Sequence, residues 1–289
     1  MVLSSKHSLS RLSIRRLPRT ILVESITGLE RAWVVNPDNN TVSVVNGLAS
    51  SKIAEIFVGT DPRALALAPD NTVWVANKDS GTISIIDVNT LTVTSSRTLP
   101  RGSRPHGIVI DWVSGHAYVA LEALEEVWKL DVYSDTVVGT TPVSNSPRHL
   151  SLTGDGSKLF VSRFITPPLP GESTTAPQTS DESGPRGGEV VVLDPSSMSV
   201  QSTVVLQHSD KQPAEITGPG FPNYLGPAII SPNGLSAYVP SKQDDILRGL
   251  SRDGQPLNHD HTVRAVTSVI DVANNSEMYG NRIDHDNAR

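Results

Sequence analysis

A repeat of about 42 residues is the feature of this sequence that most restricts its fold. An aromatic residue followed by valine recurs at spacings of 41, 44, 42 and 78 residues. Prolines that open apolar alternating runs recur at spacings of 43, 42 and 80 residues, and the longest spacing in each column contains an insertion. The aromatic column is Trp33-Val34, Trp74-Val75, Tyr118-Val119, Phe160-Val161 and Tyr238-Val239, and the proline column is Pro62, Pro105, Pro147 and Pro227.

Each repeat predicts four short strands. In the second copy, an apolar run (64–67) precedes the turn 69–71, the aromatic strand 72–76 and a third apolar run that ends at Asp87. An outer strand completes the unit, as at 52–58 in the first copy. β-branched residues dominate these runs, as they do on half-buried pleated surfaces. Four strands per 42-residue period, without helical periodicity, predict an all-β fold, a β-propeller of four-stranded blades. A β-sandwich would not explain columns that repeat at one period.

The repeats occupy residues 20–289, and a basic, Ser-rich arm precedes them at residues 1–19. The arm has no acidic residue, so it is interpreted as a disordered arm, an organelle transit peptide or the product of a wrong start codon. It contains no long apolar stretch of a secretion signal. The five predicted blades span approximately 20–60, 61–103, 104–146, 147–225 and 226–289.

Composition excludes several classes of function. The chain has no cysteine, which excludes disulfides, thiolate chemistry, Cys-based metal sites and covalent c-type haem within it. Its net charge of −6 gives no general attraction for nucleic acid. No apolar run reaches the length of about 18 residues that a membrane helix requires.

The strand motifs resemble those of a known family. Trp33-Val34-Val35-Asn36 and Trp74-Val75-Ala76-Asn77 resemble the Tyr-Val-Thr-Asn repeat of the YVTN β-propellers. Thr82 to Asp87, Pro62-Arg63 and Pro105-His106 extend that likeness over roughly residues 20–289. Two segments, 239–245 and 282–288, are similar to exported bacterial propellers that accompany a di-haem cytochrome c peroxidase-like domain. The resemblance implies a periplasmic or extracellular protein, with a haem domain beyond residue 289 and no cofactor within this chain.

The number of blades leaves two interpretations of the whole molecule. Propellers of this family usually close a ring of seven blades, whereas this sequence contains five repeats. The count favours part of a seven-bladed ring over a complete five-bladed one. An open arc would leave strand edges unpaired.

The predicted top face, at which the inner strands begin, is the expected site of function. Three long insertions (166–188, 207–226 and 242–261) fall on it, and loops of this length are usually functional or disordered. Arg63, His106 and Arg148 follow the repeat prolines, and Ala228 breaks the series. These side chains predict a partial basic ring at a channel mouth that attracts an anion such as a carboxylate, phosphate or haem propionate. The alternative is that they are repeat consensus residues, satisfied by neighbouring carbonyl groups.

A second cluster of polar residues lies in the last insertion. His259, Asp260 and His261 have side chains that ligate metals, but their spacing is not diagnostic, and such clusters arise often in polar loops. Trp112 and Trp128 lie outside the aromatic column and are expected to be exposed contact residues.

Three functions are compatible with these features. The first is a non-catalytic binding or docking scaffold whose top face takes a protein or a small anionic ligand. The second is the propeller module of a larger exported, haem-dependent redox protein. The third, a lactonase or other hydrolase, rests on fold analogy alone. The sequence contains no recognisable nucleophile elbow, phosphate-binding glycine loop or zinc-helix motif, so catalysis by this chain alone is not expected.

Overall fold

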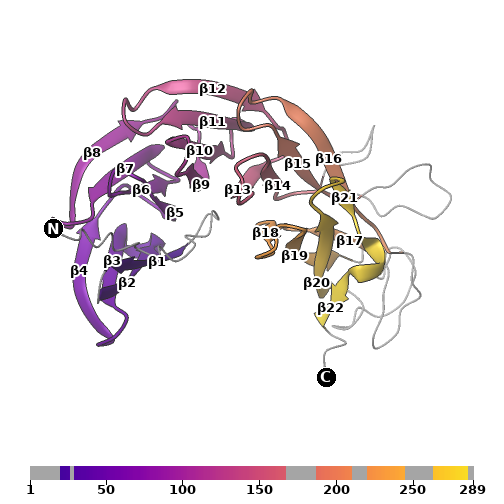
Figure 1. The fold of residues 1–289 in the computed structure, drawn as a ribbon, viewed down its shortest axis with the longest axis horizontal. Coiled ribbons are helices and arrows are strands. Elements are labelled where there is room, and N and C mark those ends of the chain that lie inside the picture. The colour runs from indigo at the N-terminus through magenta and orange to yellow at the C-terminus, as the bar shows by residue number, and fades with distance from the viewer. Residues whose placement is uncertain (1–19, 27–28, 167–186, 210–219, 245–262, 286–289) are drawn as a thin grey trace, which may run out of the picture.

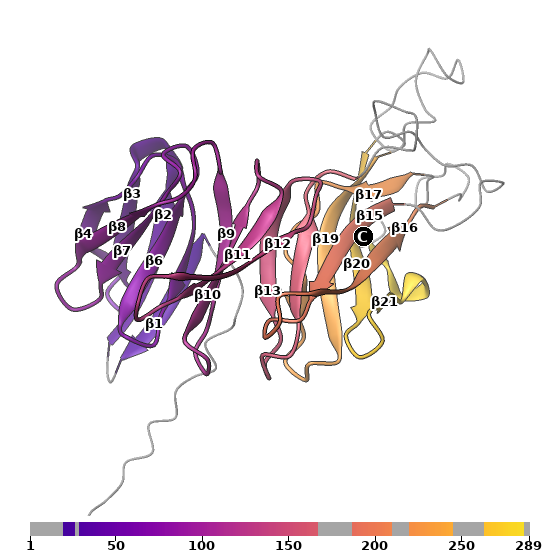
Figure 2. The same ribbon diagram turned by 90° about the horizontal axis from the view of Figure 1, so that it is seen from above.

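The computed structural model describes residues 20–26, 29–166, 187–209, 220–244 and 263–285. Their strands form five antiparallel sheets that follow one another around an arc (Figure 1). In the view turned by 90°, the sheets stand side by side as blades (Figure 2). The prediction of an all-β propeller with four-stranded blades is confirmed. Helical geometry in the described residues is limited to short 3-10 segments, which include η1 (Pro37–Asn39) and η2 (Tyr279–Asn281), so none of them forms a helix that is long and apolar enough to cross a membrane.

The first four sheets share one construction, in which four strands pair in chain order from the inner to the outer strand. The inner strands are β1 (Ile21–Ile26), β5 (Pro62–Leu67), β9 (Pro105–Asp111) and β13 (Pro147–Leu152). The second strands are β2 (Leu29–Asn36), β6 (Thr72–Asn77), β10 (His116–Leu121) and β14 (Leu159–Arg163). The third strands are β3 (Thr41–Asn46), β7 (Thr82–Asp87), β11 (Glu126–Asp131) and β15 (Gly187–Leu193). The outer strands are β4 (Ser51–Phe57), β8 (Thr92–Thr98), β12 (Val137–Pro142) and β16 (Val200–Gln207).

The fifth sheet departs from this plan at both edges. Its inner strand is divided into β17 (Phe221–Asn223) and β18 (Ile229–Ile230), which pair with opposite ends of β19 (Ser236–Asp244). Its outer edge is also divided, because β21 (Ser276–Glu277) and β22 (Ile283–Asp284) both pair with β20 (Val263–Asp271).

The cores lie between neighbouring blades. Each of the four interfaces holds a cluster of buried apolar side chains, and the aromatic column supplies the largest of them. Trp33, Trp74, Tyr118 and Phe160 are almost fully buried. The expectation of exposure for Trp112 and Trp128 is wrong, because both are partly buried against the cluster between the second and third blades. The indole Nε1 of Trp112 also donates a 2.8 Å hydrogen bond to the carbonyl oxygen of Leu67.

The end of the blades at which β5, β9 and β13 begin is called the top face here. Because the strands are antiparallel, the second strands β6, β10 and β14 end there. The three long insertions predicted on this face lie mainly on residues 167–186, 210–219 and 245–262, outside the described residues. The basic arm at residues 1–19 also lies outside them.

Candidate functional site: the top-face mouth of the inner strands

The predicted anion-binding residues lie at three equivalent positions, each directly after a buried proline that begins an inner strand. Proline suits this position, because an inner strand is a sheet edge and a missing N–H costs no ladder hydrogen bond there. The strand register shifts at each of the three positions, so that one extra residue bulges from the inner strand. Bulges of this kind redirect side chains at sheet edges. The three residues are Arg63, His106 and Arg148.

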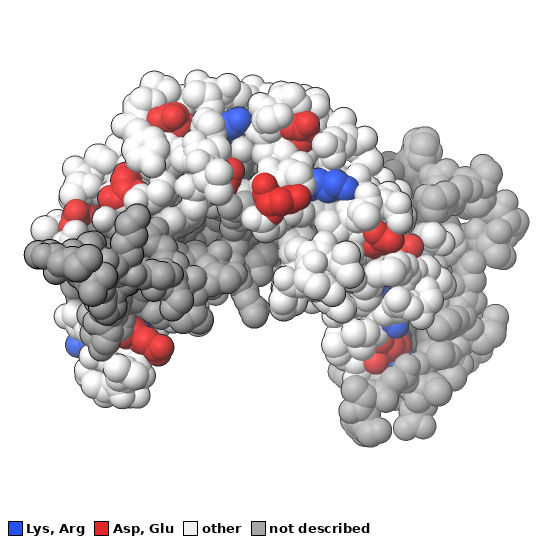
Figure 3. Space-filling model, viewed as in Figure 1, with Lys and Arg blue, Asp and Glu red and all other residues white. Residues whose placement is uncertain are grey.

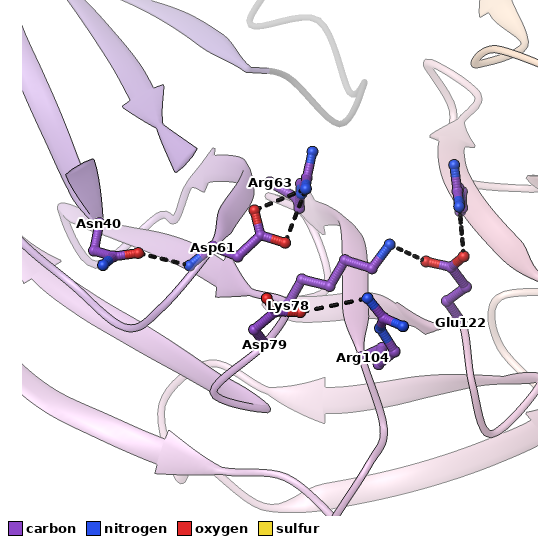
Figure 4. A network of polar contacts seen from close by, with 8 residues as sticks. Asn40, Asp61, Arg63, Lys78, Asp79, Arg104 and Glu122 are labelled. Atoms are coloured by element: carbon purple, nitrogen blue, oxygen red, sulfur yellow. Dashed lines mark hydrogen bonds and ion pairs between the residues drawn. The ribbon is translucent and has the colours of Figure 1, made fainter. Parts of the chain in front are cut away.

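A single carboxylate joins three blades at this mouth. Glu122, directly after β10, accepts hydrogen bonds of 2.9 and 2.7 Å from Nε and Nη2 of Arg148 on β13. Its other oxygen lies 2.7 Å from Nζ of Lys78, which follows β6 (Figure 4). Burial acts to raise the pKa of Glu122, but the hydrogen bonds from Arg148 and Lys78 outweigh it, and the pKa lies below its ordinary value. Glu122 is therefore an anion held between two cations.

Two imidazoles lie beside this bridge. The rings of His106 on β9 and His149 on β13 meet edge to face, with centroids 5.2 Å apart. Burial, followed by the charges of neighbouring groups that include Arg148, lowers the pKa of His106 to about 3 and that of His149 to about 4. Both imidazoles are neutral at pH 7, and the buried Nδ1 of His106 has no hydrogen-bond partner among the described residues. We call Lys78, His106, Glu122, Arg148 and His149 the mouth cluster.

A glycine allows the two histidine-bearing strands to approach. A Cβ atom on Gly107 would lie 2.3 Å from the carbonyl oxygen of Arg148. That distance is far below any van der Waals contact. The Cβ atom is fixed to the backbone of β9 and the carbonyl belongs to the backbone of β13, so no side-chain rotation relieves the clash. Glycine at this position is therefore required for β9 and β13 to lie as they do, and this spacing brings His106 and His149 together.

Arg63 occupies the equivalent position one blade away and has a partner of its own. Its Nη2 lies 2.8 Å from Oδ1 of Asp61, whose backbone N–H donates to Oδ1 of Asn40 in the first blade (Figure 4). Its side chain is 40% exposed, although its Nε is buried without a partner among the described residues. Asp79 and Arg104 form a more exposed pair nearby, at 3.4 Å.

These contacts change the expected electrostatics of the mouth. Two of the three predicted residues are ion-paired with carboxylates, and the third is a neutral histidine, so the partial basic ring is largely neutralised. On the face drawn in Figure 3, basic and acidic side chains likewise form small separate groups around the arc. Lys78 and Glu122, which were not among the residues predicted from the sequence, lie four residues after the aromatic-column residues Trp74 and Tyr118. The same position holds Phe164 and Lys242 in the fourth and fifth blades, so this column was the signal for the mouth.

Aromatic side chains of the fourth and fifth blades lie next to the mouth cluster. The guanidinium of Arg148 lies 3.4 Å from the ring centroid of Phe164, which meets Tyr224 edge to face at 4.9 Å. Nζ of Lys242 lies 4.5 Å from the ring centroid of Tyr224. Cations over aromatic faces are stabilised by the ring quadrupole. Arg148 thus contacts both the charged and the aromatic parts of the mouth.

The metal site considered at His259, Asp260 and His261 lies outside the described residues. Among the residues that the structure does describe, no group of three or more His, Cys, Asp or Glu side chains has the arrangement to hold a metal ion.

The fold relates this chain to known propellers. No family model matches it. A seven-bladed β-propeller protein of Mycobacterium tuberculosis, Rv1057, is 27% identical over 175 residues, which is 53% of this chain and 39% of that protein. The match thus covers less than two thirds of the relative's own length. It supports the same class for this chain, which folds as a β-propeller.

Solved structures of different function share the architecture. Hydrazine synthase of Kuenenia stuttgartiensis matches with a TM-score of 0.63 and 16% identity, over 94% of this chain and 66% of that one. The Pan2 WD40 domain of Neurospora crassa matches with 0.53 and 11%, over 93% and 66%. A putative 6-phosphogluconolactonase from Bacteroides uniformis matches with 0.55 and 12%, over 90% and 70%. At these identities the likeness concerns the fold alone.

Proposed function

We propose that this propeller is a non-catalytic binding module that holds a small anionic ligand at the mouth cluster. The observation that carries the proposal is the convergence of Lys78, His106 and Arg148 from three blades, with a buried imidazole nitrogen that has no partner among the described residues. Ligand sites in proteins usually contain a small number of convergent polar groups that fix the ligand's orientation. Arg148 supplies a planar, permanently charged donor that suits carboxylate or phosphate oxygens.

The protonation states favour binding over hydrolysis. A general base works best with a pKa near the working pH. The pKa of Glu122 is lowered by its two cationic partners, and those of His106 and His149 lie near 3 and 4. All three groups are therefore weak bases. The haem-linked and exported alternatives concern segments and compartments that lie beyond the contacts described here, and they stay predictions of the family resemblance.

Sulfate is a suitable first probe because it stays a dianion throughout the neutral and mildly acidic range. We expect isothermal titration calorimetry at low ionic strength to detect its binding. Charged hydrogen bonds contribute about 1.5–3 kcal/mol each, so Arg148→Gln should weaken binding by at least about tenfold. Lys52→Gln, a change to an exposed lysine on β4, is the matched control and should bind as wild type does. Equal binding by the Arg148 and Lys52 variants would place sulfate elsewhere and would contradict the proposal.

A further inference from the structure

The two imidazoles of the mouth cluster have no role in holding its ion pairs. Arg148 and Lys78 are occupied by Glu122, and neither histidine takes part in those contacts. His106 nevertheless lies against His149 at 5.2 Å, with its Nδ1 buried and unpartnered among the described residues. A buried polar atom without a partner is costly, which suggests that it meets one in another state of the site.

The charged groups around these rings follow or lie on the neighbouring inner and second strands. Lys78 follows β6, Glu122 follows β10, and Arg148 precedes His149 on β13. On β5, Arg63 is neutralised by Asp61. Two positive charges and one negative charge thus surround two neutral imidazoles, and the local net charge is +1. Adding a proton to either ring requires that this positive charge be offset.

We propose that the mouth cluster binds a dianionic oxyanion together with a proton, which is taken up by the His106–His149 pair. This inference rests on the proposed function and names its ligand class and its regulation. Two incoming negative charges exceed the local charge of +1, so the liganded cluster favours a protonated imidazole. The protonated ring carries N–H groups on both nitrogens and can donate to the oxyanion. A monoanion brings the local net charge of +1 to zero, so it stabilises a protonated imidazole much less than a dianion does.

Proton uptake and ligand affinity are coupled in both directions. If the ligand makes protonation easier, protonation strengthens ligand binding by the same factor. For the uptake of one proton, the affinity rises by up to about tenfold for each unit of pH decrease. We therefore expect sulfate to bind about tenfold more tightly at pH 5 than at pH 7. Nitrate, a monoanion over the same range, should show little change.

The test compares sulfate and nitrate binding between pH 5 and 7.5 by calorimetry. At each pH, two buffers with different ionisation enthalpies give the number of protons taken up. Wild type should take up close to one proton with sulfate at pH 5. His106→Gln combined with His149→Gln should lose the tenfold rise in sulfate affinity between pH 7 and pH 5, and any sulfate that it binds should be taken up without a proton. His285→Gln removes an exposed histidine of the fifth blade and should behave as wild type does.

Each outcome separates the two proposals. Sulfate binding that depends on Arg148 but not on pH would overturn the proton uptake and leave the anion site in place. Absence of sulfate binding throughout the pH range would overturn the proposed function and the inference that depends on it. If the double histidine variant does not fold, imidazole titration of wild type by nuclear magnetic resonance decides. Saturating sulfate should raise at least one of the two histidine pKa values, and unchanged values would reject the proposal.

Discussion

Glu24 shows how a single side chain can organise a blade. Its carboxylate accepts hydrogen bonds from Nε and Nη2 of Arg31 at 3.1 and 2.9 Å, and from the indole Nε1 of Trp33 at 3.0 Å. Nη1 of Arg31 then donates to the carbonyl oxygen of Val88 in the second blade. Glu24 and Arg31 are both buried, so the ion pair between them offsets the hydration that each charge loses on folding.

Replacing Glu24 with alanine should therefore be strongly destabilising. The change leaves the Arg31 guanidinium buried without its counter-ion, for which we expect a loss of about 3–5 kcal/mol in the free energy of unfolding. Urea denaturation monitored by tryptophan fluorescence measures it. Lys52→Ala, which breaks an exposed pair with Glu55, should have no measurable effect. A similar small effect for both variants would show that the buried network is not needed.

The lowered pKa values of His106 and His149 make the free energy of unfolding depend on pH. The ordinary histidine pKa of 6.5 applies to the unfolded chain, and folding lowers it to about 3 for His106 and about 4 for His149. The unfolded state therefore binds more protons below pH 6.5, and stability is lost as the pH falls. Each imidazole contributes a slope of about 1.4 kcal/mol per pH unit between pH 6 and 4.5. Denaturation of His106→Gln/His149→Gln over that range should be less pH-dependent than that of wild type, and equal slopes would contradict the assignment.

At the scale of the strand, the third-strand column ends in a recurring turn. Asn46, Asp87, Asp131, Asp194 and Asp271 each accept backbone N–H groups from the residues two and three positions later. These Asx turns explain why the column ends in Asp or Asn. The asparagines of the Trp-Val-x-Asn motifs have an equally local role, since Nδ2 of Asn36 and of Asn77 donates to hydroxyls of the neighbouring third strand.

Gly107 determines how closely the inner strands β9 and β13 can approach each other. Gly107→Ala places a methyl group against the Arg148 carbonyl. Because a Cβ atom and a backbone carbonyl cannot rotate apart, β9 and β13 have to separate. We expect a loss of about 1–3 kcal/mol in stability, typical of overpacking, together with weaker sulfate binding. Gly102→Ala provides a steric contrast, because its Cβ would meet no atom within 4 Å, although its positive φ adds strain. A wild-type sulfate affinity for Gly107→Ala would show that the strand spacing does not set the site.

These elements also show what the sequence can predict. The aromatic, proline and Asp columns recur because the same position has the same task in each blade: Trp74 fills the core against the next blade, and Asp87 ends its strand in a turn. These columns predicted the blades. The mouth depends on contacts between repeats. Glu122 gave no signal by residue type, since its position holds Lys78 in the preceding blade and Phe164 in the following one. The bulges that place Arg63 and Arg148 depend on strand register, which the residue pattern does not contain.

At the scale of the whole molecule, stability is distributed over interfaces between neighbours. Besides the apolar clusters, cations on one blade donate to carbonyl groups of the next, as Lys129 does to Pro195 and Lys158 does to Val272. Each blade thus depends mainly on the blades beside it, as in other repeat proteins.

A core substitution should therefore act locally. Leu150 is fully buried in the cluster between the third and fourth blades, and Leu150→Ala should cost about 2–5 kcal/mol. Hydrogen exchange should show the greatest loss of protection in β9 to β16 and the smallest in β1 to β4. Uniform loss across all blades would indicate a single cooperative unit instead.

The carboxylate shared by three blades has a consequence for how such a protein can evolve. Repeats grow and shrink by duplication and deletion, and the fold itself tolerates this because the first four blades share one plan. The mouth does not share that freedom, since Lys78, Glu122 and Arg148 belong to successive copies and work only in that order. Exchanging two blades would preserve the period and break the bridge that Glu122 makes to Lys78 and Arg148. This bridge therefore favours one order of the copies, which the architecture alone would leave interchangeable.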